Sequence, residues 1–208
     1  MKKYELTDET MTVDGVTYHR IRACKDFNAQ GYHVKAGDLG GYVESECNID
    51  QDGNAWVGGL ARIGGNARVF GNTHVRGNAR IGDNAVIGGN AVIRDNAWIG
   101  DNAWIGGHAV IGGNVVIGDN AVIGGNAEVS KFDHIIVIGP IGSRNDYTTF
   151  CRSKDNDIIV KCGCFNGNIS EFLEKVNETH GNNKYAAEYR AAAELAKIHI
   201  DLEGEKTE

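Results

Sequence analysis

The chain has 208 residues, a formal net charge of −7, 29 glycines and a single proline. This length fits one or two domains, and the acidic balance lacks the basic face that nucleic-acid binding needs. No apolar run is long enough for a membrane span, and no basic start precedes an apolar stretch, so we predict a soluble protein without a signal peptide. Five cysteines, an odd number, favour the reducing cytoplasm.

Residues 1–53 are predicted to form an N-terminal β cap. Asp14-Gly15 lies between β-branched residues, which is typical of a two-residue hairpin turn. The second strand of this hairpin is expected to run through Tyr18, Ile21 and Ala23. A solenoid needs such a cap because its open end exposes unpaired backbone and apolar core.

Residues 54–130 consist of a six-residue unit repeated without insertion, for example Ile-Gly-Asp-Asn-Ala-Val from Ile81 to Val86. An aliphatic residue recurs at every sixth position: Val57, Ile63, Val69, Val75, Ile81, Ile87, Ile93, Ile99, Ile105, Ile111, Ile117, Ile123 and Val129. This period predicts a solenoid of stacked coils with three units in each coil and the aliphatic residue pointing inward. Asn precedes the corner Ala in most units, and we expect these Asn residues to adopt the left-handed backbone of the corners.

The unit (aliphatic, Gly or acidic, two variable residues, small, variable) resembles the hexapeptide-repeat family of left-handed parallel β-helices. That resemblance implies the fold; many members are acyltransferases, some are γ-type carbonic anhydrases, and many have no demonstrated chemistry. Gly37 to Glu44, followed by Asn54-Ala-Trp-Val57, further resembles the YdcK-like group of bacterial and prophage-borne proteins over roughly residues 1–130. This second resemblance implies a phage or prophage origin. Fold alone does not imply function.

Residues 131–202 break the repeat and are predicted to form a small α+β module, with a disordered tail at 203–208. Strands are expected at 134–138, 147–152 and 158–164. A helix is expected from Asn168, with a capping box to Glu171 and a stop at Gly181, and a second helix at 184–199. The predicted fold class is therefore mainly β: a left-handed parallel β-helix with an N-terminal β cap and a C-terminal α+β module.

The residue after each Ala is predicted to point outward and to stack on its equivalent eighteen residues later. The three columns are Trp56, His74, Val92, Val110 and Glu128; Arg62, Arg80, Trp98 and Val116; and Arg68, Val86, Trp104 and Val122. The later residues of these columns are mostly Val and Trp, which would form large exposed apolar patches. Such patches are unusual on a monomer, so we expect the C-terminal module and a homotrimer interface to cover them. The alternative is an aromatic ligand groove with Trp98 or Trp104 as a stacking wall and Arg80 as a further ligand-binding residue.

His108 replaces Asn in the corner column of Asn54, Asn72, Asn90 and Asn126. Hexapeptide acyltransferases resemble one another in using a His near an inter-subunit cleft, so His108 is the candidate general base, with acetyl-CoA or another acyl-CoA as cosubstrate. The other interpretation is a tolerated corner substitution. No loop interrupts the coils, although such a loop is common in those enzymes.

The candidate metal ligands are two groups of residues. The first group is an acidic ladder in which Asp recurs every eighteen residues, at Asp83, Asp101 and Asp119. These carboxylates either are solvated at the turns or bind calcium. The second group is a set of three cysteines: Cys151, Cys162 and Cys164. They would share one face of the sheet if their hairpin loop has an even number of residues, and they could then bind zinc together with His134 or His180. The other interpretation is that these thiols are buried hydrophobic side chains. We predict no metal site.

Ser143, Arg144 and Asn145 lie in a glycine-bounded loop and could contact an anionic ligand; a plain loop is the alternative. We therefore expect a non-catalytic interaction or ligand-binding protein without a cofactor. Its trimeric β-helix would present the C-terminal module to a protein or small-molecule partner. The alternative function is an acyl-CoA-dependent acyltransferase with His108 as general base.

Overall fold

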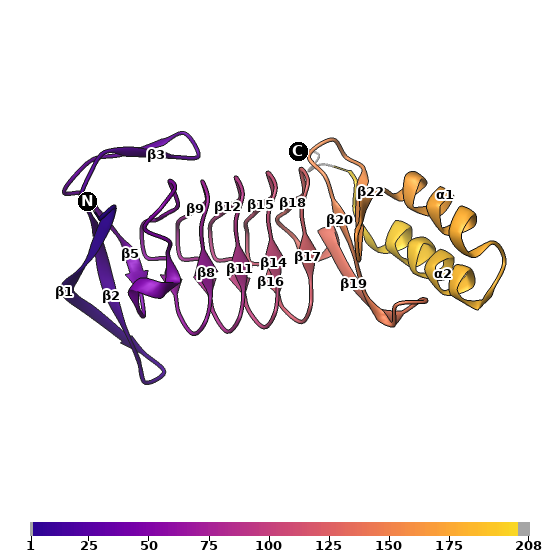
Figure 1. Ribbon diagram of the computed structural model, residues 1–208, viewed down its shortest axis with the longest axis horizontal. Helices are drawn as coiled ribbons and strands as arrows, with labels where there is room; N and C mark the ends of the chain where they lie inside the picture. Colours follow the sequence, from indigo (N-terminus) through magenta and orange to yellow (C-terminus); the bar gives the residue numbers. More distant parts are fainter. Residues whose placement is uncertain (1, 204–208) are drawn as a thin grey trace.

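The computed structural model describes residues 2–203 and is an elongated, mainly β molecule (Figure 1). A β cap lies at one end, stacked coils form the middle, and a small sheet with two helices forms the other end (Figure 1). None of the helices within residues 2–203 is long and apolar enough to cross a membrane. The tail expected to be disordered at 203–208 lies outside the described residues except for Glu203.

The N-terminal cap contains the predicted hairpin. Strand β1 (Tyr4–Val13) pairs antiparallel with β2 (Val16–Ala23) around Asp14 and Gly15, which both have positive φ. A second, smaller hairpin joins β3 (Phe27–Ala29) to β4 (Tyr32–Val34), and we call residues 27–34 the arm. Figure 1 shows the arm reaching from the cap along the side of the first coils.

Strand β5 (Leu39–Val43) connects the cap to the coils. It pairs antiparallel with β2 and parallel with β7, with Val43 opposite Ile63. The short helix η1 (Glu46–Asn48) follows, and Ile49 then pairs with Val69. Both offsets are twenty residues (63 − 43 and 69 − 49), so stacking begins before residue 54, in a coil that is two residues longer than the repeat.

The regular coils consist of two-residue strands joined by tight turns. These strands are β6 (Trp56–Val57), β7 (Arg62–Ile63), β8 (Arg68–Val69), β9 (His74–Val75), β10 (Arg80–Ile81), β11 (Val86–Ile87), β12 (Val92–Ile93), β13 (Trp98–Ile99), β14 (Trp104–Ile105), β15 (Val110–Ile111), β16 (Val116–Ile117), β17 (Val122–Ile123) and β18 (Glu128–Val129). They stack in parallel into three sheets with an eighteen-residue register, as in Ile81 opposite Ile99. The second residue of each strand points inward and is at most 2% exposed, which confirms the parallel β-helix.

The left-handed corner positions differ from the prediction. They fall on the residue before each Asn, where Gly or Asp stands; for example, Asp83 and Asp101 have φ of 54° and 49°. The Asn residues instead form hydrogen-bonded ladders. Asn66 Nδ2 donates to Asn84 Oδ1 at 3.0 Å, and Asn84 Nδ2 donates to Asn102 Oδ1 at 3.3 Å. An amide side chain both donates and accepts, so identical amides can bond from coil to coil.

The C-terminal part begins with the short helix η2 (Phe132–His134). Strands β19 (Ile135–Ile141), β20 (Asp146–Arg152), β21 (Ile158–Cys162) and β22 (Phe165–Asn168) then form an antiparallel sheet in that order. The sequence predicted one strand across residues 158–164, but the two-residue turn at Gly163-Cys164 reverses the chain and creates β22. Helices α1 (Ile169–His180) and α2 (Lys184–His199) follow as predicted, with the Asn168–Glu171 capping box in place.

This sheet is buried on both faces. Ile135, Cys151 and Ile159 pack on the core of the coils, and Thr149 Oγ1 accepts a hydrogen bond from the Val122 N–H at 3.0 Å. Phe150 and Val160, on the opposite face, pack against the two helices. The sheet therefore covers the open end of the β-helix and also supports the helices.

A charge should not be tolerated inside the coils. Ile99 is fully buried, so Ile99→Asp places an unpaired carboxylate in the core at a cost of several kcal/mol, on the order of the whole stability of a small domain. We expect loss of soluble protein, or a large fall in melting temperature measured by circular dichroism. Arg80→Asp is the matched control, because Arg80 is exposed and points outward directly beneath Trp98. An unchanged melting temperature for Ile99→Asp would show that the inward register is wrong.

Candidate ligand-binding site

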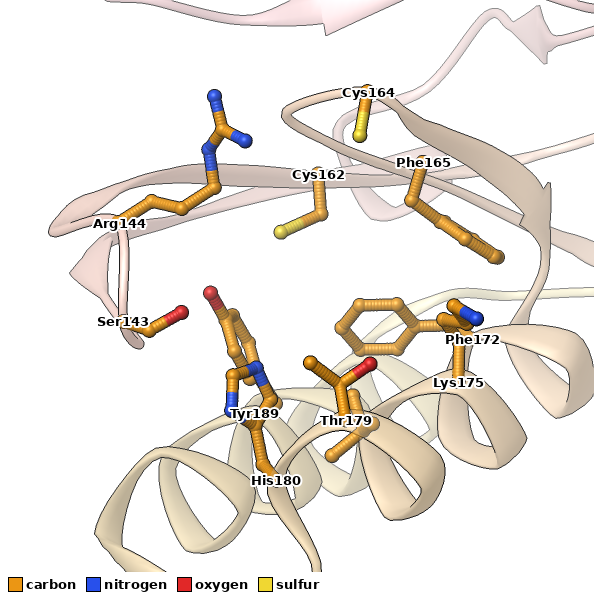
Figure 2. A pocket seen from close by; sticks show the side chains of 11 residues that line it. Ser143, Arg144, Cys162, Cys164, Phe165, Phe172, Lys175, Thr179, His180 and Tyr189 are labelled. Atoms are coloured by element: carbon orange, nitrogen blue, oxygen red, sulfur yellow. The ribbon is translucent and has the colours of Figure 1, made fainter.

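A pocket of about 230 Å³ opens between the C-terminal sheet and its helices (Figure 2). The turn between β19 and β20, the turn between β21 and β22, and helices α1 and α2 all contribute to it. The residues that line it are Ser143, Arg144, Cys162, Cys164, Phe165, Phe172, Lys175, Val176, Thr179, His180 and Tyr189. Residues from four segments of the chain thus meet at one site.

The base of the pocket is aromatic. Phe172 on α1 lies edge-on to Phe150 at 5.8 Å and to Tyr189 at 5.7 Å, and its ring is tilted against Phe165 at 5.5 Å (centroid distances). These separations lie in the range where aromatic pairs attract one another beyond simple burial. Helical spacing places Phe172 and Val176 on the buried side of α1, so the base belongs to the packed core.

The turn between β19 and β20 is held in place by helix α2. The Gly142 N–H donates to Glu188 Oε2 at 2.7 Å, and Gly142 has a φ of 68°. A Cβ at this position would overlap the Tyr189 ring, so only glycine fits. This contact fixes the turn that presents Ser143 and Arg144 at the mouth of the pocket (Figure 2).

Polar groups surround the aromatic base. Burial raises the pKa of Tyr189, and the adjacent Cys162 acts in the same direction, so its hydroxyl stays protonated at neutral pH. Cys162 Sγ accepts a hydrogen bond from Thr148 Oγ1 at 3.3 Å. Tyr189, Ser143 and Thr179 can therefore donate hydrogen bonds to a ligand.

The charged groups of the pocket are cationic. Lys175 is paired with Glu178 at 2.9 Å on the exposed side of α1, whereas Arg144 has no hydrogen-bond or ion-pair partner within residues 2–203. Arg144 lies across the turn at Gly163, where an added Cβ would be 2.8 Å from its Nε. No carboxylate lines the pocket. The guanidinium stands at the rim of the pocket and points away from the aromatic rings (Figure 2), so the site suits a ligand with an apolar body on the base and an anionic end at the rim.

The structure places the predicted site residues in four different regions. Ser143 and Arg144 line the pocket; Asn145 belongs to the same turn but does not. Arg80 and Trp98 line a separate hollow of about 210 Å³ beside the N-terminal hairpin, and Trp104 lies exposed on another sheet. His108 is exposed at a corner, and its backbone N–H donates to Gly125 O.

No pattern in the sequence assigned the aromatic residues to this pocket. Phe172 and Tyr189 fall within the two predicted helices, and Phe165 belongs to the strand that was not predicted. Their helical spacing is a signal for burial alone, because core and pocket positions have the same pattern. Two polar residues of α1 also line the pocket: Lys175 and Thr179, which are one turn apart at the border between the buried side of the helix and solvent.

The proposed cysteine cluster does not form. Residues 153–157 connect β20 to β21, an odd number, so the condition for a shared face fails. Cys151 faces the coils and Cys162 faces the helices. Complete burial raises the pKa of Cys151 to about 12, so this thiol is protonated and inert. No group of three or more His, Cys, Asp or Glu side chains in the described part of the chain is arranged to hold a metal.

The acidic ladder is satisfied by the backbone. Asp83 Oδ2 accepts a hydrogen bond from the Asp101 N–H at 3.1 Å, and Asp101 Oδ2 accepts one from the Asp119 N–H at 2.8 Å. Each carboxylate thus contacts the left-handed corner of the coil above. These bonds give the ladder a structural role without a bridging cation.

The outward columns are covered differently from the prediction. The arm covers Trp56 and His74, while the C-terminal sheet sits on the end of the coils. Trp98, Trp104 and Val116 remain exposed within the chain. The C-terminal module extends the axis of the helix and does not cover these three residues (Figure 1), so their burial in a homotrimer interface stays a prediction.

A family model described as "Bacterial transferase hexapeptide (six repeats)" matches residues 60–95 and 96–131. A comparison with curated proteins finds no match. The two matched segments contain all strands from β7 to β18, and these strands form the stacked parallel coils. Family members are often acyltransferases or scaffolds. The repeat region is therefore similar to the bacterial transferase hexapeptide repeats, and it folds as a parallel β-helix.

Proposed function

We propose that the protein is a non-catalytic ligand-binding protein in which the β-helix is a rigid scaffold that presents the C-terminal module. The observation that carries this proposal is the pocket between the C-terminal sheet and helices, with its aromatic base and unpaired Arg144. The sheet beneath it also packs on the core of the coils, which favours a pocket fixed with respect to the scaffold.

The chemistry of the pocket selects an organic anion. Phe165, Phe172 and Val176 offer apolar contact, and Arg144 offers a guanidinium that can bind a carboxylate, sulfonate or phosphate through two parallel hydrogen bonds. Tyr189 and Ser143 add neutral donors. The aromatic base and the guanidinium together favour binding as the function of this site.

Replacing Arg144 should weaken the binding of an aromatic anion. With 1-naphthalenesulfonate as the probe in isothermal titration calorimetry, we expect Arg144→Gln to raise the Kd about tenfold, because hydrogen bonds to charged groups contribute about 1.5–3 kcal/mol. Arg80→Gln is the control, since Arg80 lies on the coils outside the pocket. Equal affinity of Arg144→Gln and the unaltered protein would contradict the proposal, and weaker binding by Arg80→Gln alone would favour the groove beside Trp98.

The second candidate function is an acyl-CoA-dependent acyltransferase with His108 as general base. It is favoured by the family description, which names transferases, and by the position of His108, where the Asn72–Asn90 ladder stops. Against it, the His108 side chain is exposed and makes no hydrogen bond to a second polar group within residues 2–203.

Acetyl-CoA should not be turned over. We expect the purified protein, incubated with acetyl-CoA and a panel of amine and hydroxyl acceptors, to release free thiol at the background rate. General-base catalysis typically contributes 10²–10⁴-fold, roughly, so a real activity would be evident. Turnover that collapses in His108→Ala would establish the acyltransferase instead.

The scaffold is proposed to be a homotrimer. Trp98 and Val116 stack on one face and are each 49% exposed, and Trp104 on a second face is 41% exposed. Burying apolar surface stabilises an assembly by about 25 cal/mol per Å², so these columns favour association.

Light scattering coupled to size exclusion should report a mass of three chains. The double variant Trp98→Asp, Val116→Asp should shift this mass towards one chain, because it places two carboxylates in the proposed interface. The far-ultraviolet circular dichroism of the variant checks that the coils are intact. A single-chain mass that is independent of concentration for the unaltered protein would rule out the trimer.

A further inference from the structure

A second cavity, of about 530 Å³, lies between the arm and the first outward column of the coils. Tyr32 and Gln30 line it from the arm, and Trp56, His74 and Val92 line it from stacked strands β6, β9 and β12. The cavity is on the opposite end of the molecule from the C-terminal pocket and shares no lining residue with it.

Two ring nitrogens of largely buried side chains face this cavity without a partner among the described residues. Trp56 is 2% exposed and His74 is 7% exposed, and in the part of the chain that the structure describes neither the indole N–H nor the imidazole ring has a hydrogen bond. Both rings converge on the space beside Gly58. A Cβ built on this glycine would lie 3.8 Å from Trp56 Nε1 and 3.9 Å from His74 Nε2. Both nitrogens open into the cavity instead of into packed protein, so a ligand bound there can take up their unused hydrogen-bonding capacity.

The arm holds the two rings in position. Tyr32 stacks on His74 with centroids 5.0 Å apart and planes at 26°, and Phe27 meets Trp56 edge-on at 5.5 Å. The arm's tip is attached to the coils by one long hydrogen bond, from the Gln30 N–H to Asn72 Oδ1 at 3.4 Å. Aromatic contacts therefore fix the orientation of both nitrogens while leaving the space beside Gly58 open.

The charge of the cavity selects the ligand. Arg76 is its only charged lining residue, and no carboxylate lines it. Burial, reinforced by the positive charge of Arg76, lowers the pKa of His74 to about 4, so this ring is neutral at pH 7 and its Nε2–H tautomer can donate. Three hydrogen-bond donors thus surround the same space: an indole N–H, an imidazole N–H and a guanidinium. None of the three groups has to accept a hydrogen bond there.

We propose that this cavity binds a small carboxylate whose oxygen atoms accept hydrogen bonds from Trp56 Nε1, His74 Nε2 and the Arg76 guanidinium. The glycines at positions 58, 59 and 77 leave room for the carboxylate at the edge of the coils, and Val92 and Leu39 provide apolar contact for a short body. This site is independent of the organic-anion pocket in the C-terminal module.

The indole N–H signals provide a direct test. The chain contains three tryptophans, at positions 56, 98 and 104, so a ¹⁵N–¹H spectrum has three indole signals, and Trp56→Phe identifies that of Trp56. We expect sodium benzoate to shift the Trp56 signal downfield in a saturable manner and to leave the other two in place. Sodium chloride at the same ionic strength should produce no such shift.

Two variants make the test specific. Arg76→Gln should weaken benzoate binding about tenfold, because it removes a charge-assisted bond. The matched control is Arg94→Gln. Arg94 lies eighteen residues later in the same column and does not line the cavity, and its Nη1 lies 3.8 Å from Asp95 Oδ2. Arg94→Gln and Arg144→Gln should both bind benzoate normally at Trp56. An unmoved Trp56 signal, the same shift with chloride, or equal weakening by Arg94→Gln and Arg76→Gln would overturn the proposal, whether or not the C-terminal pocket binds its anion.

Discussion

Parallel stacking of one coil on the next, at a register of eighteen residues, is the constraint on which the rest of the structure depends. The backbone N–H of Trp98 donates to Val115 O in the coil above at 2.9 Å, and equivalent bonds recur along the solenoid. Stacking places equivalent residues of successive coils on one another, so the residue type at each position must pack well against the same type in the coils above and below. Aliphatic residues satisfy this inside, Asn amides satisfy it in ladders, and Asp or Gly satisfies it at the left-handed corners.

Both ends of the stack need another structure to bury the last coil, and each end structure also lines a cavity. At the N-terminal end, β5 belongs to the cap sheet and to the first coil, and the arm that follows β2 covers Trp56 and His74. At the C-terminal end, one face of the sheet buries the core of the coils and the other supports α1 and α2. The N-terminal cavity thus lies where the arm meets the coils, and the C-terminal pocket lies on the side of the sheet that faces away from them.

The periodic elements could be predicted from the sequence and the contacts between distant segments could not. The repeat at Ile81 to Val86 specified the inward register, and Asn168 with Glu171 specified the start of α1, because both signals are local. The left-handed corner was assigned to Asn because Asn tolerates it, but ladder bonds favour Asn one position later. The pairing of Cys151 with Ile159 and the stacking of Tyr32 on His74 depend on loop length and on chain reversal, which no local pattern encodes. Ser143 and Arg144 were found from their loop, whereas the aromatic base beneath them came from elements far along the chain.

An organic anion bound between the C-terminal sheet and its helices should leave the coils unchanged. Hydrogen–deuterium exchange can be measured by mass spectrometry with and without saturating 1-naphthalenesulfonate. We expect slower exchange in peptides that cover residues 142–145 and 162–180, with unchanged exchange across residues 56–129. Unchanged exchange in the C-terminal peptides, or slowing confined to the coils around Trp98 and Trp104, would contradict it.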